Sequence, residues 1–115
     1  MVCSGHYLTS MAAMRVLLND GNAFDAAIAV AAAETVTIPT SCGLGGDVFA
    51  VLYHAASGSL VGLNGSGGAA SGATSEFYRS QGYTKMPLRG PHSISVPGEV
   101  DAWETIHSRF SHCRR

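Results

Sequence analysis

The sequence has few charged residues. Only 13% of its 115 residues are Asp, Glu, Lys or Arg, about half of the roughly 25% found in an average soluble domain. Its Lys and Arg residues are scattered and the formal net charge is −1, so no nucleic-acid partner is expected. Apolar residues make up 46%, which a chain this short buries poorly by itself. The composition predicts either one layer of a larger sandwich or a subunit that needs a partner.

Long apolar runs are also lacking. The longest, residues 26–33, is mostly alanine and ends at Glu34, whereas a membrane span needs roughly 18 residues or more. Residues 1–10 do not have the basic end and apolar core of a secretory signal. We therefore expect no membrane partner. The compartment stays open, with the cytoplasm favoured by the absence of a signal.

Cysteine and histidine are too few and too scattered for a metal site. Cys3, Cys42 and Cys113 are an odd number at wide spacing, which fits neither a disulfide framework nor a zinc pattern. No two histidines have the i, i+4 spacing of helical metal ligands. We expect no metal and no cofactor. The histidines are His6, His54, His92, His107 and His112.

Two helices are predicted early in the chain. Thr9 or Ser10 caps the first, which runs to about Asn19, because a hydroxyl accepts free N–H groups at a helix start. Asn22 caps the second, residues 23–36, which is apolar nearly all round. A helix without a polar face is normally buried on several sides, so this one is expected to be an inner helix.

A β-hairpin is predicted next, followed by smaller elements. Residues 47–54 and 60–63 are the strands, rich in residues that favour strands, around a turn at residues 55–59. Thr74 is expected to cap a short helix, and residues 92–96 to form a short strand. Pro97 leads into a last helix, residues 98–110, because proline suits a first helical turn. Its expected core residues are Val100, Trp103, Ile106 and Phe110.

Three segments in order carry a family resemblance: GNAFDAAIAVAAAETV (21–36), GLGGDVFAVLYHAASGSLVGLNGSG (43–67) and SVPGEVDAWETIHSRF (95–110). The chain resembles the opening of the γ-glutamyltransferase (γ-glutamyltranspeptidase)-like family of N-terminal-nucleophile hydrolases. The resemblance implies an α+β fold, a fragment of an αββα four-layer sandwich. Residues 1–110 would be the amino-terminal part of the large subunit. Residues 111–115 do not look like the family and are interpreted as a non-family tail.

The resemblance also implies where the chemistry lies. Such relatives are proenzymes that cleave themselves and free a Thr, whose amino group acts as base while its hydroxyl attacks an amide carbonyl. That Thr begins a small subunit downstream, and no Thr of this sequence matches it. We expect no catalytic residue here, no activity from the chain alone, and two partners: the carboxy-terminal region with its small subunit, and a small amide substrate.

Ser66 is the one candidate substrate-binding residue. Family members that bind a γ-glutamyl group carry an Arg just after the second hairpin strand, where its guanidinium group pairs with the substrate carboxylate. In this sequence Ser66 occupies that position. The nearest arginines in sequence are Arg79 and Arg89. A non-γ-glutamyl amidohydrolase, of oxamate or acylase type, is therefore favoured. The alternatives are a true γ-glutamyltransferase of glutathione metabolism, and a non-catalytic truncated product or interaction module.

Four other features have a structural and a functional interpretation. GLGGD precedes a strand, so a turn into the hairpin is favoured over a phosphate loop, which needs strand-loop-helix order. Asp25 and Asp47 lack an evident acid–base partner. We expect Asp25 to cap its helix and Asp47 to hold loop amides. Trp103 is expected in the core.

Overall fold

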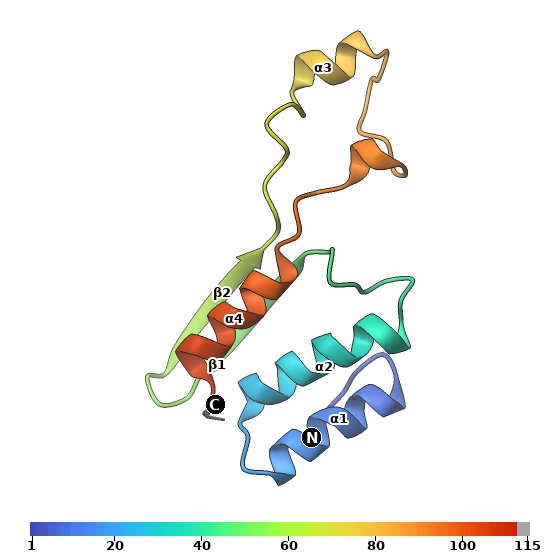
Figure 1. Ribbon diagram of the computed structural model, residues 1–115. Helices are drawn as coiled ribbons and strands as arrows, with labels where there is room; N and C mark the ends of the chain where they lie inside the picture. The colour runs from blue at the N-terminus through green and yellow to red at the C-terminus, as the bar shows by residue number, and fades with distance from the viewer. Residues whose placement is uncertain (113–115) are drawn as a thin grey trace.

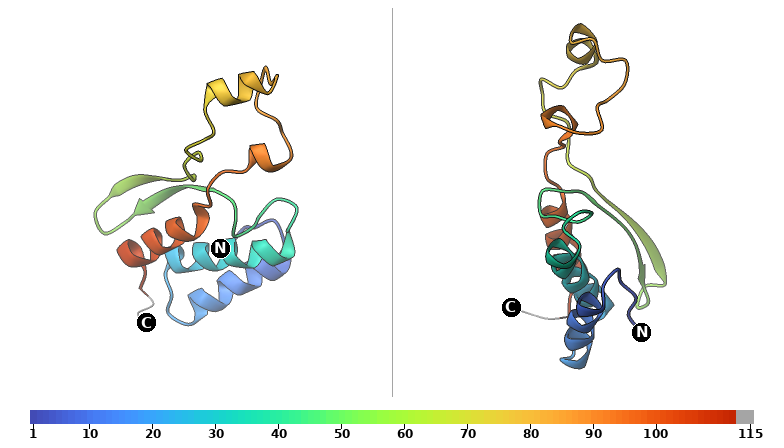
Figure 2. Two further views of the ribbon diagram at one scale, coloured as in Figure 1. Left: turned by 45° about the horizontal axis from the view of Figure 1, so that its top comes forward. Right: turned by 90° about the vertical axis from the view of Figure 1, so that its right-hand side faces the viewer.

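The computed structural model describes residues 1–112 as a layer of helices covered on one face by a β-hairpin (Figures 1 and 2). Helix α4 contacts α2 and both strands, and α1 lies along the other side of α2. The elements, in chain order, are α1 (Tyr7–Leu18), α2 (Ala23–Thr37), β1 (Val48–His54), β2 (Ser59–Gly65), α3 (Ser75–Ser80), the 3-10 helix η1 (Pro91–Ser93) and α4 (Glu99–Phe110).

The start of α2 is determined locally. The Asn22 side chain accepts hydrogen bonds from the backbone N–H groups of Phe24 and Asp25 at 2.9 and 3.0 Å. The Asp25 carboxylate accepts one from the Asn22 N–H at 2.9 Å. This reciprocal pair is a capping box, so the predicted capping roles of Asn22 and Asp25 are confirmed.

The predicted cap of α1 is wrong. The helix begins earlier, at Tyr7, and His6 is its N-cap, with its Nδ1 accepting the Leu8 N–H at 3.2 Å. Thr9 instead lies inside the helix and is fully buried. Its hydroxyl faces α2, where it is 2.8 Å from the Thr37 hydroxyl. A tertiary hydrogen bond therefore uses the side chain that the sequence suggested for capping.

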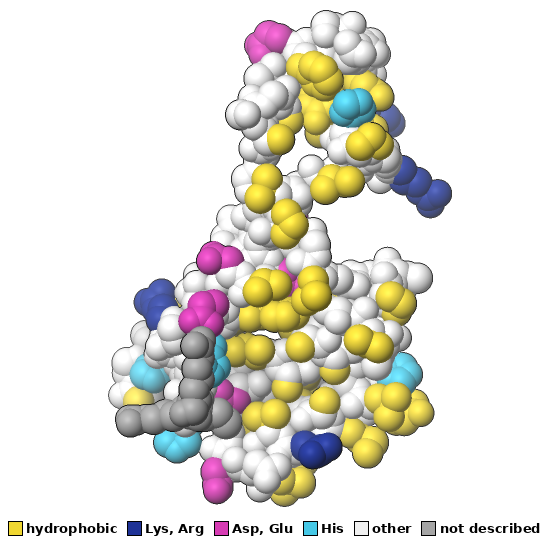
Figure 3. Space-filling model, in the orientation of Figure 1, with side chains coloured by type: hydrophobic (Ala, Val, Ile, Leu, Met, Phe, Trp, Pro, Cys, Tyr) yellow, Lys and Arg dark blue, Asp and Glu magenta, His cyan; other side chains and the backbone are white. Residues whose placement is uncertain are grey.

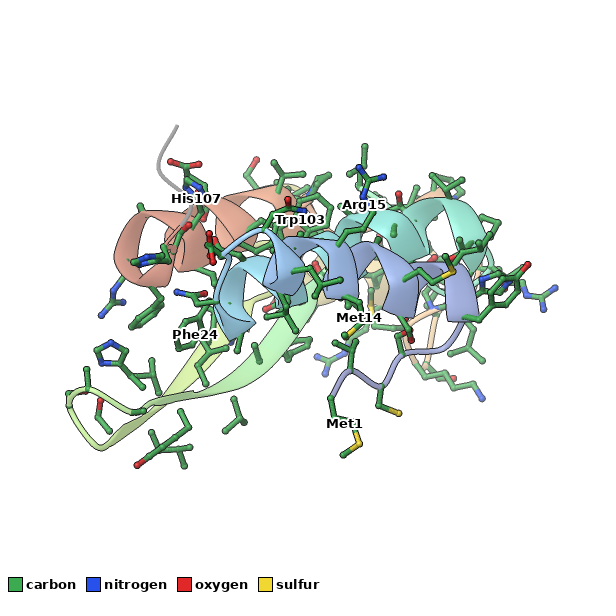
Figure 4. The ribbon with its side chains drawn as sticks, turned by 90° about the horizontal axis from the view of Figure 1, so that it is seen from below. Met1, Met14, Arg15, Phe24, Trp103 and His107 are labelled. Atoms are coloured by element: carbon green, nitrogen blue, oxygen red, sulfur yellow. The ribbon has the colours of Figure 1, made fainter. Side chains whose placement is uncertain are left out.

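An aromatic cluster joins three elements at one end of the helix layer. Phe24 points from α2 towards the hairpin (Figure 4) and stacks on Phe110 of α4, with ring centroids 5.0 Å apart. His54, at the end of β1, lies 6.2 Å from Phe24 and 5.6 Å from Phe110. The Asn22 side chain donates to the Phe110 carbonyl at 2.7 Å. These contacts hold the C-terminal end of α4 against the start of α2.

The hairpin is apolar on both faces. Leu52 points to the helices and is only 8% exposed, whereas Phe49, Val51 and Tyr53 point away and are 62–75% exposed. Leu60, directly opposite Tyr53, is 71% exposed on the same outer face. A sheet with one solvated face normally alternates apolar and polar residues. This hairpin is therefore built to be covered on both sides.

Two expectations fail in the second half of the chain. The strand predicted at residues 92–96 does not form, because this segment has no neighbouring strand to pair with; Pro91–Ser93 is a 3-10 helix instead. Val100 is 52% exposed, while Ala102 and Ile106 of the same helix are buried. Trp103 is half-buried beside Ile28 of α2. Ala102 and Ile106 thus form the buried apolar face of α4.

Helix α2 is less buried than predicted. It lies between α1 and α4, but Asp25 and Ala26 are its buried residues, and most others are half-buried. Among the described helices none is long and apolar enough to cross a membrane.

The predicted tail, residues 111–115, is described only as far as His112. Ser111 and His112 both donate hydrogen bonds to the Asp25 carboxylate.

Because the outer face of the hairpin exposes large apolar side chains, we predict that the isolated chain self-associates. Large exposed apolar patches find a partner or aggregate, and light scattering should therefore detect oligomers. Tyr53→Lys, on this face opposite Leu60, should shift the chain towards the monomer. Leu88→Lys is the control, because Leu88 is 93% exposed but lies far from the hairpin in sequence. A monodisperse parent chain with a sharp cooperative melt would contradict the prediction.

Candidate functional site

Three segments of the chain cross where the hairpin, α4 and the protruding part of the fold meet. They are residues 46–47, residues 65–68 and residues 95–99, together called the loop crossing below. The Gly46 carbonyl accepts hydrogen bonds from the N–H groups of Gly98 and Glu99 at 3.2 and 3.1 Å. The Val96 N–H donates to the Gly68 carbonyl at 3.2 Å. Backbone atoms of the three segments are thus in direct contact.

Glycine is required at two points of the loop crossing. A Cβ at Gly67 would lie 1.2 Å from the Val96 carbonyl oxygen. A Cβ at Gly98 would lie 2.4 Å from the Gly65 carbonyl oxygen. Both are far inside van der Waals contact with backbone that cannot move aside. The glycines of the GSG and VPG motifs are therefore needed for close backbone approach.

Asp47 ties the crossing together. Its carboxylate accepts the Gly67 N–H at 3.0 Å and the Ser95 hydroxyl at 3.2 Å from both oxygens. Hydrogen bonds to a charged acceptor are stronger than neutral ones. The prediction that Asp47 holds loop amides is confirmed. Its second partner, Ser95, was missed, because nothing in the sequence relates residues so far apart.

Ser66, the predicted substrate-binding residue, lies exposed directly after β2. Its N–H and its hydroxyl both donate to the Asn64 side-chain oxygen, at 3.0 and 2.8 Å. Asn64 pairs with Phe49 and so belongs to the outer face of the hairpin. Ser66 therefore lies at the end of the exposed, apolar outer face of the hairpin. It presents a neutral hydroxyl there, and its role in binding stays a prediction.

An open cavity of about 490 Å³ begins at the loop crossing. Gly67 and Ser95 line its base, and Tyr78, Arg79 and Lys85 line it further out. These outer residues belong to the arm, defined here as residues 69–94, which projects away from the helix layer (Figure 1). Sequence reasoning named Arg79 as a nearby arginine but missed the cavity, since only the folded arm brings its walls together.

Two ionisable groups behind the GLGGD loop have raised pKa values. Glu99 is 6% exposed, and this burial raises the pKa of its carboxyl. The pKa of the Cys42 thiol is raised by desolvation first, then by the Glu34 carboxylate. A thiol is nucleophilic as its thiolate, so Cys42 is poorly suited to act as a nucleophile. Among the described residues no cluster of metal-binding side chains exists.

Comparison with known proteins decides the family. The family model for gamma-glutamyltranspeptidase matches residues 9–114. This chain belongs to that family of N-terminal-nucleophile hydrolases. It is 45% identical over 111 residues to the glutathione hydrolase-like YwrD proenzyme of Bacillus subtilis (strain 168), covering 96% of this chain and 21% of the relative. The recognition made from the three sequence segments is confirmed.

Relatives named for other activities match as well. The chain is 38% identical over 104 residues to the oxamate amidohydrolase proenzyme of Klebsiella pneumoniae, covering 90% of this chain and 19% of the relative. The crystal structure of cephalosporin acylase from Bacillus halodurans superposes with a TM-score of 0.85 at 40% identity, covering 92% of this chain and 20% of that one. The predicted α+β fold, part of the family's αββα sandwich, is confirmed. The chain spans about a fifth of the length of these proteins.

Replacing Asp47 tests the loop crossing. Asp47→Ala removes the acceptor of Gly67 and Ser95 and should destabilise the chain by about 1–2 kcal/mol, after allowing for its exposure. It should also increase protease cleavage within the arm, because the carboxylate joins Gly67 and Ser95, which flank the arm. Thermal unfolding and limited proteolysis measure the two effects. Asp101→Asn, an exposed carboxylate on α4, is the control. Unchanged cleavage of the arm in Asp47→Ala would contradict this role.

The raised pKa of Glu99 predicts a pH dependence. Its folded pKa lies above the ordinary value of 4.5, so between these two values the folded state binds more protons than the unfolded state. Stability therefore falls as pH rises through that window. Glu99→Gln removes this cost, so its melting temperature should exceed the parent's at about pH 7 and approach it at about pH 4. Exposed Glu76→Gln should show no such trend; the same behaviour in both variants would contradict the assignment.

Proposed function

We propose that this chain is the amino-terminal part of the large subunit of an amide hydrolase proenzyme. Its nucleophile is the N-terminal Thr of a small subunit formed by another segment. The amino group of that Thr accepts the hydroxyl proton, and the hydroxyl oxygen attacks the amide carbonyl. The amine leaves, and water then releases the acyl group as a carboxylate. The remaining large-subunit region, the small subunit and a small amide are the proposed partners.

The contribution of this chain is one wall of the substrate pocket. The outer face of the hairpin is apolar and would pack against the second sheet of the sandwich. Ser66 lies at the end of that face, on a loop held by Asp47 and by the close approach at Gly67. A group so positioned can border a substrate without taking part in bond breaking. We therefore assign Ser66 to substrate binding and assign no catalytic residue to this chain.

We infer that the complete enzyme prefers an acyl group other than γ-glutamyl. The observation that carries this inference is the neutral Ser66, whose hydroxyl already donates to Asn64 at 2.8 Å. A hydroxyl cannot replace the bidentate, charge-assisted contact that an Arg makes with a carboxylate. The likeness to an oxamate amidohydrolase and to a cephalosporin acylase supports this preference.

Two alternatives rest on specific observations. Arg79 and Lys85 line the cavity that starts at Gly67, so a cation near the loop could serve a true γ-glutamyltransferase, in keeping with the likeness to a glutathione hydrolase-like proenzyme. The exposed apolar hairpin face would equally suit a non-catalytic interaction module. Activity of a complete enzyme carrying this segment distinguishes the three functions.

A chimeric proenzyme provides the test. Residues 9–112 of this chain replace the matching region of the Bacillus subtilis relative, and kcat/KM is measured on γ-glutamyl p-nitroanilide and on butyryl p-nitroanilide. The chimera should process itself and use the butyryl substrate better. Ser66→Arg should raise kcat/KM for the γ-glutamyl substrate by about tenfold or more, because it adds a charge-assisted contact.

Three controls accompany the chimera. Ser66→Ala should leave the preference unchanged, since it removes a hydroxyl but adds no charge. The 115-residue chain alone should show no turnover above a boiled sample, because it has no N-terminal Thr nucleophile. A chimera that prefers the γ-glutamyl substrate and gains nothing from Ser66→Arg would overturn the substrate preference. A processed chimera inactive on both amides would overturn the amide hydrolase function.

A further inference from the structure

The Glu99 side chain is buried at the start of α4, against the turn formed by residues 43–46. Glu99 is only 6% exposed, and its Oε2 lies 3.5 Å from the position that a Cβ on Gly46 would occupy. The pKa of the Cys42 thiol, raised mainly by desolvation and by Glu34, is raised further by the Glu99 charge. The Glu99 N–H donates to the Gly46 carbonyl at 3.1 Å. The backbone thus fixes the carboxylate beside the loop between α2 and β1.

No group in the described part of the chain neutralises this carboxylate. Neither a hydrogen-bond donor nor a Lys or Arg of residues 1–112 contacts it, and burial is the one cause that raises its pKa. The ionisable groups around it are Cys42, Glu34 and Asp47, none of which can carry a positive charge. A buried carboxylate is normally paired or hydrogen-bonded, because removing its charge from water is costly. Within residues 1–112, Glu99 is therefore a buried acceptor without a donor.

The helix dipole does not account for this burial. A carboxylate in the first turn of a helix interacts favourably with the free N–H groups there, and α4 carries two, Glu99 and Asp101. Asp101 is exposed, so it interacts with the dipole and remains hydrated. Glu99 could do the same from an exposed position. Its burial therefore points to a contact beyond the helix.

Exposed apolar side chains come from the segments that meet at Glu99. Leu44, in the turn beside Glu99, and Val96 and Val100, on either side of the start of α4, are 50–57% exposed. Figure 3 shows hydrophobic side chains gathered on the helix layer below the arm. In protein interfaces, apolar contacts of this kind surround a buried polar contact and exclude water from it. A protein segment therefore fits this surface better than a free ion.

We propose that Glu99 is the docking point for an Arg or Lys side chain from the part of the proenzyme outside this chain. The basic group pairs with the carboxylate, and the residues next to it cover Leu44, Val96 and Val100. This inference rests on the proposed function only in requiring a longer proenzyme; the chain spans 21% of its Bacillus subtilis relative. It gives a role to Glu99, which, unlike Asp25, has no partner among the described residues.

The test compares Glu99→Gln in the isolated chain and in the folded chimeric proenzyme. In the isolated chain the substitution removes an unpaired buried charge and should raise the melting temperature at about pH 7. In the chimera it leaves the docked cation without its partner and should lower the melting temperature by about 2 °C or more. Glu99→Asp keeps the charge and should retain part of the chimera's stability.

Asp101→Asn is the matched control, because it neutralises the exposed carboxylate of the same helical turn. It should change the melting temperature of either protein only slightly. A Glu99 that acts only within this chain would give the same sign in both proteins. A rise of the melting temperature in the Glu99→Gln chimera would therefore overturn the proposal.

A second measurement uses the 115-residue chain itself and needs no chimera. Trp103 is the only tryptophan of the sequence and lies one helical turn after Glu99, so its fluorescence reports binding there. The probe is n-butylguanidinium, and n-butylurea is its neutral analogue. The guanidinium should bind saturably to the parent chain, and at least about tenfold more weakly to Glu99→Gln, as expected for loss of a charge-assisted contact. Equal binding to both chains, equal binding of n-butylurea, or no binding would overturn the proposal.

The docking contact and the proposed hydrolase fail independently. A folded chimera that is inactive on both amides, but that Glu99→Gln destabilises, would reject the hydrolase and support the docking contact. An active chimera that Glu99→Gln stabilises would reject the docking contact alone. Melting temperature and turnover thus separate the two proposals.

Discussion

The close approach of three backbone segments at the loop crossing is the constraint on which the rest of the structure depends. Gly67 passes so near the Val96 carbonyl, and Gly98 so near the Gly65 carbonyl, that neither position can hold a Cβ. The Asp47 carboxylate then joins the end of β2 to the segment before α4. Because the hairpin, α4 and the arm all meet here, this crossing sets the direction in which each of them leaves.

Charge is scarce in this chain, and its distribution is informative. The capping box uses Asp25, and the loop crossing uses Asp47, so both carboxylates that could have suggested acid–base chemistry stabilise backbone instead. Glu99 is buried, which raises the pKa of its carboxyl. The cations of the arm, in contrast, line an open cavity. Asp25 and Asp47 are therefore assigned a stabilising role, whereas ionised Glu99 costs stability.

Elements that depend on contacts between neighbouring residues were predicted correctly from the sequence, whereas those that depend on contacts between distant residues were not. The capping box of α2 and the Thr74 cap of α3 depend on neighbours three residues apart or fewer, and both were predicted. The hairpin was predicted within one or two residues at each end of its strands, because its turn and apolar pattern are local. The strand at residues 92–96 was wrong, since a strand exists only when another strand pairs with it. Thr9 was misassigned for a similar reason: its partner, Thr37, lies on another helix.

By itself the sequence determined the family, the order of helices and hairpin, and the neutral residue after β2, because all of these are carried by short motifs and local periodicity. Only the tertiary structure decided that Asp47 meets Ser95, which backbone atoms Gly67 and Gly98 approach, and that Arg79 and Lys85 share one cavity with Gly67. These contacts join residues 20 to 48 positions apart where Asp47 is concerned. No periodicity spans such separations, so the path of the folded chain alone brings these groups together.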